Sequence, residues 1–233
     1  MNFTEGVIFA VDKPYRMSSF GALAHVRYLV SKKMGVKRVK IGHAGTLDPL
    51  ATGVLVLCTG RATKQIETWQ QHTKEYVATL QLGATTASYD REHTVDFTFP
   101  TRHITKSLVL ETLRQFEGDV LQVPPSYSAC KIDGHRAYKL TRRGEDVELQ
   151  AKPIHIDEIE LLHYDPMRKE VAIRVVCGKG TYIRALARDI GEAMGSGAFL
   201  TSLRRTRVGD IRVEDCIDFD HIYEWLDRQT IEY

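Results

Sequence analysis

Two side chains that could do chemistry lie five residues apart in a glycine-rich turn. His43 and Asp48 belong to the segment IGHAGTLDPLATGVLVLCTGRATK, which runs from Ile41 to Lys64. Asp48 precedes Pro49, and this order biases its backbone to the extended region, so its carboxylate is expected in a loop and not in a helix. A carboxylate can act as a nucleophile or stabilise a developing positive charge. The segment therefore predicts a reactive loop built around one acidic side chain.

The residues after this loop predict the elements that hold it. Val54 to Cys58 is a short apolar run and predicts a buried strand. Ala62 to Gln70 predicts a helix with Lys64 in its first turn. Glu75 to Leu82 alternates apolar and polar residues, the pattern of a half-buried strand, and Tyr76 stands at its start. The acidic loop is thus expected between well-ordered elements.

The remaining elements follow from hydrophobic spacing and from turn and cap residues. In chain order we expect a strand at Gly6 to Val11, a helix that Ser18 or Ser19 caps and that ends near Gly35, a helix at Ile104 to Phe116, a hairpin of Ile154 to Leu162 with Glu170 to Cys177, a helix that Thr181 can cap with Arg184 in its first turn, and a terminal helix in HIYEWLD.

Simpler explanations exist for each of these residues alone. An aspartate before proline is often a turn former whose side chain bonds its own backbone, and a lone histidine is more often structural than catalytic. His43, Asp48 and His72 could also be taken as metal ligands of a hydrolase, but their spacing does not fit such a site. The complete string is more informative than any one residue.

That string resembles the catalytic loop of bacterial tRNA pseudouridine synthases of the TruB family, which carry GH(T/A)G(T/A)LDPLATGVL…G…ATK. Four further stretches resemble the same family. They are KEY ending at Tyr76, the pattern P-x-x-Y-S-A-x-K-x-x-G from Pro124, GTYIR ending at Arg184, and LRR beginning at Leu203. The resemblance extends to about residue 215, and a match of this length is highly specific.

The resemblance implies an α+β fold with a mixed, mostly antiparallel central sheet, flanked by helices and loops and with an active-site cleft across the sheet. It implies a single catalytic domain over residues 1–233 with an RNA-binding insertion at 124–152. Many bacterial relatives continue into a small C-terminal RNA-binding domain. Here we expect only an acidic tail at 209–233.

The resemblance also implies the site residues. The aspartate of the family's loop is catalytic, which assigns Asp48, and the arginine of GTYIR pairs with it, which assigns Arg184. Substrate contacts are implied for His43, Lys64, Tyr76, Tyr182, Arg184 and Leu203. The residues themselves leave open whether Asp48 attacks C1′ or C6 of the uridine or only abstracts a proton.

Residues 124–152 interleave aromatic and basic side chains, and this mixture suits RNA because rings stack on unpaired bases while Lys and Arg meet phosphates. RNA contacts are expected at Lys13, Tyr127, Lys131, Arg142 and Arg143. The implied partner is the T arm of tRNA, bound by a monomer without a cofactor.

Composition agrees with a soluble globular enzyme of the cytoplasm. The net charge is only +2, because eight acids and two basic residues after Val208 mask a basic body. The four cysteines form no CxxC pair, and neither a secretion signal nor an apolar run of about 20 residues is evident. A tRNA-binding or tRNA-folding module without catalysis is the alternative, although binding alone would not need Asp48, Tyr76 and Arg184 together.

Overall fold

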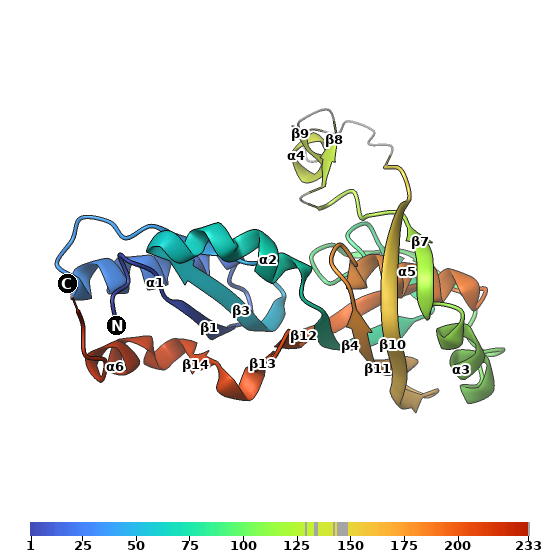
Figure 1. Ribbon diagram of the computed structural model, residues 1–233. Coiled ribbons are helices and arrows are strands. Elements are labelled where there is room, and N and C mark those ends of the chain that lie inside the picture. The colour runs from blue at the N-terminus through green and yellow to red at the C-terminus, as the bar shows by residue number, and fades with distance from the viewer. Residues whose placement is uncertain (129, 133–134, 142, 144–148, 233) are drawn as a thin grey trace. The chain divides into compact units, whose positions relative to one another are not determined.

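The computed structural model describes residues 1–128, 130–132, 135–141, 143 and 149–232 (Figure 1). The chain divides into two compact units. Unit 1 comprises Met1–Tyr76 with Arg204–Tyr233, and unit 2 comprises Val77–Leu203. Two strands, β4 (Lys74–Leu82) and β12 (Ala198–Val208), have residues in both units.

The strands of unit 1 follow the order β14-β1-β3-β12. β1 pairs in parallel with β14 and antiparallel with β3, while β2 adds to β3 and β13 adds to β12, both antiparallel. The bounds of these strands are β1 (Ile8–Lys13), β2 (Ile41–His43), β3 (Ala51–Thr59), β13 (Ile211–Arg212) and β14 (Ile217–Asp218).

Successive side chains of β1 and β3 enter two different core clusters, as the pleat of a strand requires. One cluster joins Phe9 and Leu57 to apolar residues of α1 (Ser19–Lys33) and α6 (Ile222–Asp227). The other joins Ala10 and Val56 to residues of α2 (Ile66–Gln71). Three 3-10 helices complete the unit: η1 (Gly60–Gln65), η2 (Val213–Asp215) and η3 (Phe219–His221). Both sides of these strands are therefore covered.

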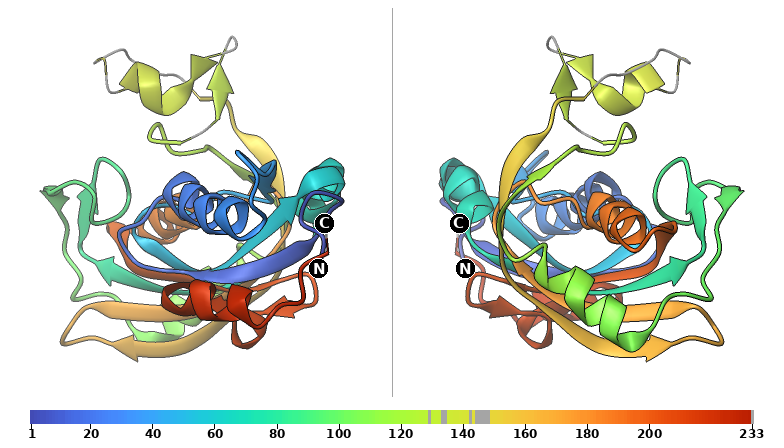
Figure 2. Two further views of the ribbon diagram at one scale, coloured as in Figure 1. Left: turned by 90° about the vertical axis from the view of Figure 1, so that its left-hand side faces the viewer. Right: turned by 90° about the vertical axis from the view of Figure 1, so that its right-hand side faces the viewer.

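In unit 2 the strand order is β12-β4-β11-β10-β7, in which β12 takes part through residues 198–203. The long hairpin of β10 and β11 is antiparallel, and so is the pair β10 and β7. The helix α3 lies across β10 (Figure 2). The bounds are β7 (Gly118–Gln122), β10 (Lys152–Asp165), β11 (Glu170–Cys177), α3 (Lys106–Arg114), α5 (Ile183–Ala193), the pair β5 (Ala84–Thr86) and β6 (Val95–Thr98), the pair β8 (Lys131–Ile132) and β9 (His135–Arg136), and α4 (Ala137–Thr141).

The predicted α+β class with a mostly antiparallel mixed sheet is confirmed. Ser18 caps α1 as expected, and β4 alternates between buried and half-buried residues along its whole length. The predicted helix at Ala62 to Gln70 was only partly right, because its first turn is the 3-10 helix η1. There the hydroxyl of Thr63 donates to the carbonyl of Gly60 at 2.8 Å, a side-chain bond of the kind that competes with α-helical pairing.

Candidate active site

Asp48 lies in the loop between β2 and β3, as its position before Pro49 predicts. The amide of Ala51 donates to the carbonyl of Asp48 at 3.1 Å and closes a turn in which proline holds the second position. The preceding residue, Leu47, is buried. The carboxylate is therefore carried by a short turn that is fixed at both ends.

Ser19 fixes the residue immediately before Asp48. Its hydroxyl accepts from the amide of Leu47 and donates to the carbonyl of Leu47, both at 2.8 Å, and Ser19 itself is buried. Ser18 performs the capping, because its hydroxyl accepts from the amide of Gly21 at 3.0 Å. The two consecutive serines thus have different tasks, one in the helix and one in the loop.

We expect Ser19→Ala to lower kcat about tenfold or more, because an ångström of misplacement of a reacting group can cost about a hundredfold. It should also lower the free energy of unfolding by about 2 to 4 kcal/mol, since both backbone groups of Leu47 lose their buried partner. Ser18→Ala is the matched control. It removes a cap worth about 1 kcal/mol and should leave kcat unchanged. Equal effects of the two substitutions on kcat would contradict a positioning role for Ser19.

Arg205 connects β12 to β3 and to the loop that carries Asp48, and the sequence analysis did not identify it. Its Nε donates to the carbonyl of Val54 at 2.8 Å and its Nη2 to the carbonyl of Gly45 at 3.2 Å. The side chain is 1% exposed. Gly53 permits this approach, because a Cβ there would stand 2.1 Å from the carbonyl oxygen of Arg205. A charged side chain thus supports the loop from inside.

Lys13 is fully buried, and its Nζ donates to the carbonyls of Pro14 at 2.9 Å and Met17 at 2.6 Å. Burial lowers the pKa of Lys13 to about 8, an effect that the negative charge of Asp48 opposes and the positive charge of Arg205 reinforces. A buried ammonium group offers no surface to a phosphate, so the structure argues against the predicted RNA contact of Lys13. Its charge acts instead beside Asp48.

We expect the free energy of unfolding of the wild type to rise by about 2 to 3 kcal/mol between pH 7 and pH 10, relative to Lys13→Met. The folded-state pKa of Lys13 is lowered from 10.5 to about 8. Below pH 8 both states hold the proton and the charged group opposes folding. Between pH 8 and 10.5 the unfolded chain binds more protons, so stability rises with pH. Urea titrations at both pH values measure the free energy of unfolding. An equal change in this free energy between pH 7 and pH 10 for the wild type and Lys13→Met would contradict the prediction.

His43 lies at the end of β2, and its ring is neutral near pH 7. Burial lowers the pKa of His43, the positive charge of Arg205 lowers it further, and the backbone of Gly45 opposes the shift. The ring Nδ1 is buried without a partner at hydrogen-bond geometry among the described residues. A neutral imidazole with a spare nitrogen suits a hydrogen bond to a substrate better than a charge contact.

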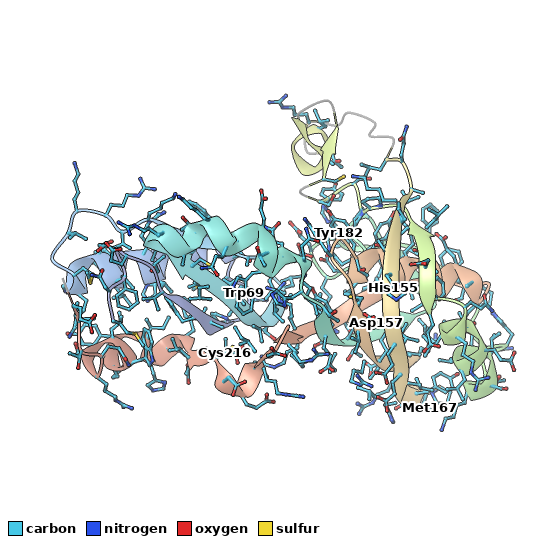
Figure 3. The ribbon with its side chains drawn as sticks, viewed as in Figure 1. Trp69, His155, Asp157, Met167, Tyr182 and Cys216 are labelled. Carbon is cyan, nitrogen blue, oxygen red and sulfur yellow. The ribbon has the colours of Figure 1, made fainter. Side chains whose placement is uncertain are left out.

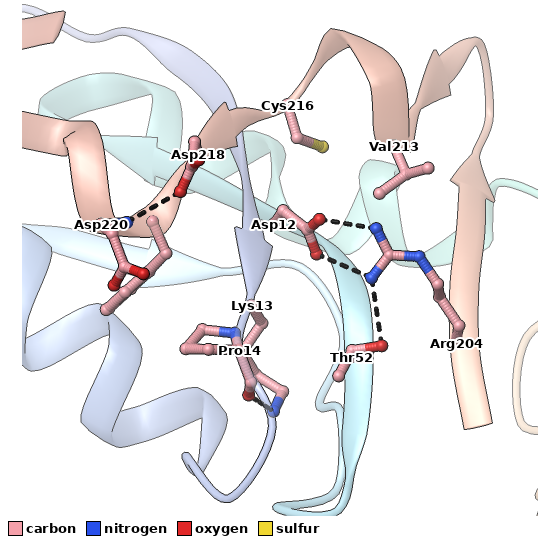
Figure 4. Close-up of a pocket in the computed structure, with 10 residues that line it drawn as sticks. Asp12, Lys13, Pro14, Thr52, Arg204, Val213, Cys216, Asp218 and Asp220 are labelled. Atoms are coloured by element: carbon pink, nitrogen blue, oxygen red, sulfur yellow. Dashed lines mark hydrogen bonds and ion pairs between the residues drawn. The ribbon is translucent and has the colours of Figure 1, made fainter. Parts of the chain in front are cut away.

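A polar hollow of about 280 Å³ lies elsewhere in unit 1 (Figure 4). At its edge Arg204 holds both carboxylate oxygens of Asp12, at 3.1 and 2.6 Å, and its Nη1 also donates to Thr52 at 3.1 Å. These contacts join β12, β1 and β3. Asp48 and His43 do not line the hollow, and the contacts of Arg204 align the three strands.

In unit 2, Arg184 lies in the first turn of α5 and is 4% exposed. Its Nη1 donates to the carbonyl of Ser88 at 3.1 Å and its Nη2 to the carbonyl of Tyr127 at 3.0 Å. Its Nε lies 3.7 Å from the carboxylate of Asp90, which is also buried. Asp90 was not identified from the sequence. Its carboxylate in turn accepts from the Ser88 hydroxyl at 2.6 Å and from the amide of Glu92 at 2.9 Å.

Tyr182 is the N-cap residue of α5 (labelled in Figure 3), and its backbone is held by the amide side chain of Gln122 on β7. Gln122 accepts from the amide of Tyr182 at 2.8 Å and donates to its carbonyl at 3.2 Å. Thr181 does not cap the helix as predicted, since its hydroxyl donates to the carbonyl of Gly178 at 3.2 Å. Gln122 therefore orients the turn that presents Tyr182 and Arg184.

Among the residues predicted to contact RNA, Tyr127 is half-buried, with its ring against that of His93 at a centroid distance of 4.5 Å. Arg143 is exposed. Lys131 belongs to β8, but its side chain and all of Arg142 lie outside the described residues. The predicted RNA contacts of these four residues stay predictions.

The other predicted substrate contacts are placed as follows. Lys64 is exposed in η1, Tyr76 is buried on β4, and Leu203 is half-buried on β12. Asp48 belongs to unit 1 and Arg184 to unit 2. The structure describes each unit separately, so the predicted ion pair of Asp48 with Arg184 stays a prediction.

Among the residues that the structure describes, no helix has the length and apolar character of a membrane-spanning segment. The same residues include no cluster of three or more His, Cys, Asp or Glu side chains that could bind a metal ion.

Comparison with protein families identifies relatives along the whole chain. A family described as "TruB family pseudouridylate synthase (N terminal domain)" matches residues 32–183, and a "tRNA pseudouridylate synthase B C-terminal domain" matches residues 184–232. The protein called tRNA pseudouridine synthase B of Bacteroides thetaiotaomicron is 62% identical over all of this chain and 98% of its own length. That of Mycobacterium leprae is 43% identical over 93% of this chain and 68% of its own.

Solved structures show the same fold. A Cbf5-Nop10-Gar1 complex contains a chain with a TM-score of 0.68 and 27% identity, covering 97% of this chain and 56% of that one. An H/ACA RNP bound to a substrate RNA containing 2′-deoxyuridine contains one with a TM-score of 0.67, 26% identity and the same coverage. The present chain thus spans little more than half the length of those chains. The resemblance seen in the sequence is confirmed, and the chain belongs to the TruB family of pseudouridylate synthases.

Proposed function

We propose that this protein is an isomerase that converts uridine to pseudouridine at position 55 in the T loop of elongator tRNAs. The observation that carries the proposal is the Asp48 turn. Its family sequence is intact, and the backbone just before it is held by the buried side chains of Ser19, at Leu47, and Arg205, at Gly45. The relatives named tRNA pseudouridine synthase B support tRNA as the substrate.

The reaction breaks the C1′–N1 glycosidic bond, turns the uracil ring and joins C1′ to C5. The proton on C5 is released and N1 ends protonated, so atoms and electrons balance without a redox partner. Asp48 supplies the carboxylate that acts on the nucleotide, as a nucleophile or as a base. The target nucleotide must leave its stack to reach this side chain.

Other site residues hold the nucleotide. Tyr76 offers a ring for stacking, a contact worth on the order of 1–3 kcal/mol, and neutral His43 hydrogen-bonds the extruded nucleotide. Arg184 orients the Asp48 carboxylate with its planar fork of donors. Lys64, Tyr182 and Leu203 complete the surroundings of the ribose and the base.

The working enzyme in this proposal is a monomer in the cytoplasm, where its tRNA substrates occur. Residues 1–233 act as one catalytic domain. The insertion at 124–152 binds the T arm through Tyr127, Lys131, Arg142 and Arg143.

Tritium release from tRNA carrying [5-³H]uridine tests the proposal, because forming the C1′–C5 bond expels the label. We expect release from whole elongator tRNA and none when uridine 55 is replaced by cytidine. Mapping of the product should find pseudouridine at that position. Release from the cytidine-substituted tRNA would overturn the assigned position, and tRNA binding without any release would favour a tRNA-folding module.

A further inference from the structure

The solvent face of α1 and the chain around it carry an unusual charge pattern. From Lys13 to Leu47 the sequence contains eight Lys or Arg residues and neither Asp nor Glu. Six of these cations make no ion pair with the described residues: Arg16, Arg27, Lys32, Lys37, Arg38 and Lys40. Such a surface carries a positive potential that attracts anionic ligands such as nucleic acid.

Aromatic rings stand among these cations. Phe20 is 67% exposed, Tyr28 is 63% exposed and Tyr15 is 50% exposed. Tyr28 and Lys32 are four residues apart on α1 and are therefore neighbours on its surface, and Phe20 lies about two turns before Tyr28. We call the exposed residues Tyr15, Arg16, Phe20, Tyr28, Lys32, Lys37 and Arg38 the α1 face. Single exposed rings are common on protein surfaces, but rings among unpaired cations are the mixture that single-stranded and looped RNA binds.

Two other occupants of the α1 face are disfavoured. A second copy of this chain would bring the same positive charges together, and like charges repel across an interface. A membrane-surface helix must bury an apolar side in lipid, yet the apolar side of α1, including Leu23, Val26 and Val30, is already packed in the core of unit 1.

The position of the helix indicates which part of an RNA would meet it. α1 begins at Ser19, whose hydroxyl bonds Leu47 beside Asp48. Its 15 residues then extend about 22 Å from that point, at ~1.5 Å per residue. RNA whose uridine lies at Asp48 and which also follows α1 must therefore continue well beyond the target nucleotide.

We infer that the α1 face binds the tRNA body outside the T arm, with Lys32, Lys37 and Arg38 on backbone phosphates and Phe20 and Tyr28 against unpaired bases. This inference rests on the proposed function, since it takes tRNA as the substrate. It assigns to unit 1 a contact with tRNA in addition to the predicted insertion at 124–152.

The test measures the Kd of two RNAs, whole tRNA and an isolated T-arm stem-loop, over a range of salt. The triple variant Lys32→Gln/Lys37→Gln/Arg38→Gln should weaken whole-tRNA binding about tenfold and reduce its salt slope by about 2, at ~0.7 to 0.9 per lost phosphate contact. The double variant Phe20→Ala/Tyr28→Ala should weaken it about tenfold with the slope unchanged. Neither should change stem-loop binding more than about twofold.

Matched controls come from unit 2. Arg102→Gln/Lys106→Gln/Arg114→Gln removes the same charge from exposed positions, and Phe97→Ala removes a ring that is 69% exposed. The inference is overturned if the α1 variants match these controls, if stem-loop binding falls equally, or if the variants lose binding only to phosphatidylserine vesicles. Tritium release by the wild-type enzyme is measured on both RNAs. Its absence would refute the proposed function without altering the binding comparison.

Discussion

Asp48→Asn should lower the rate of pseudouridine formation by about 10⁴-fold or more, because the loss of a sole nucleophile or base commonly has an effect of this size. The amide keeps the shape of the side chain and loses the charge. The loop should persist, since Ser19 bonds the backbone of Leu47 and Arg205 bonds the carbonyl of Gly45. Binding of tRNA should therefore stay within about threefold of wild type.

Single-turnover tritium release at saturating enzyme measures the chemical step, and filter binding measures affinity. Asp157→Asn is a suitable control, because it removes a carboxylate from the exposed side of β10. Retention of more than about 1% of the wild-type rate by Asp48→Asn would remove Asp48 from the chemistry. A parallel loss of tRNA affinity would indicate a damaged loop instead of a missing reactive group.

Local sequence patterns predicted most of the elements that support the site. The strict alternation of β4, the apolar run of β3 and the serine cap of α1 depend on neighbours within a few residues, so the sequence alone indicates them. The loop position of Asp48 was likewise predictable from a neighbouring residue, because Pro49 follows it. The main local error, a single helix at Ala62 to Gln70, arose from one side-chain bond of Thr63.

Contacts between distant residues were not predictable in this way. Ser19 meets Leu47 from 28 positions away, Arg205 meets Gly45 from 160, and Gln122 holds Tyr182 from 60. Each is a polar side chain whose partner is a backbone group, so no pattern of residue types marks the pair. A weak signal existed for Arg205, which belongs to the LRR stretch that resembles the family, and for Ser19, a second serine next to the one that caps the helix.

These contacts share a physical design. Catalytic loops must be exposed enough to admit substrate, and their backbone groups then need partners other than a strand ladder. Ser19 and Arg205 supply those partners from buried positions, so the loop is rigid without belonging to a sheet. Gln122 does the same for the turn before α5. Preorganised supports of this kind are what hold a reacting group to the tolerance that catalysis requires.

Arg184→Met should lower pseudouridine formation about 10³-fold and the free energy of unfolding by about 3 to 5 kcal/mol. The stability loss is expected because Asp90 would remain buried without its nearby guanidinium, and breaking a buried ion pair from one side has this effect. The activity loss is expected because the predicted partner of Asp48 disappears. Urea titration and single-turnover tritium release measure the two losses separately.

A second substitution distinguishes structure from chemistry. Asp90→Asn keeps an oxygen that can accept from the Ser88 hydroxyl and the Glu92 amide while removing the charge. In Arg184→Met/Asp90→Asn the uncompensated carboxylate is gone, so the part of the lost stability that it causes should return. The part due to the carbonyls of Ser88 and Tyr127, which still lack their Arg184 donors, should not. If Arg184 acts only on Asp90, activity returns with it. If Arg184 also orients Asp48, as we expect, stability recovers in part and the rate stays about 10³-fold low.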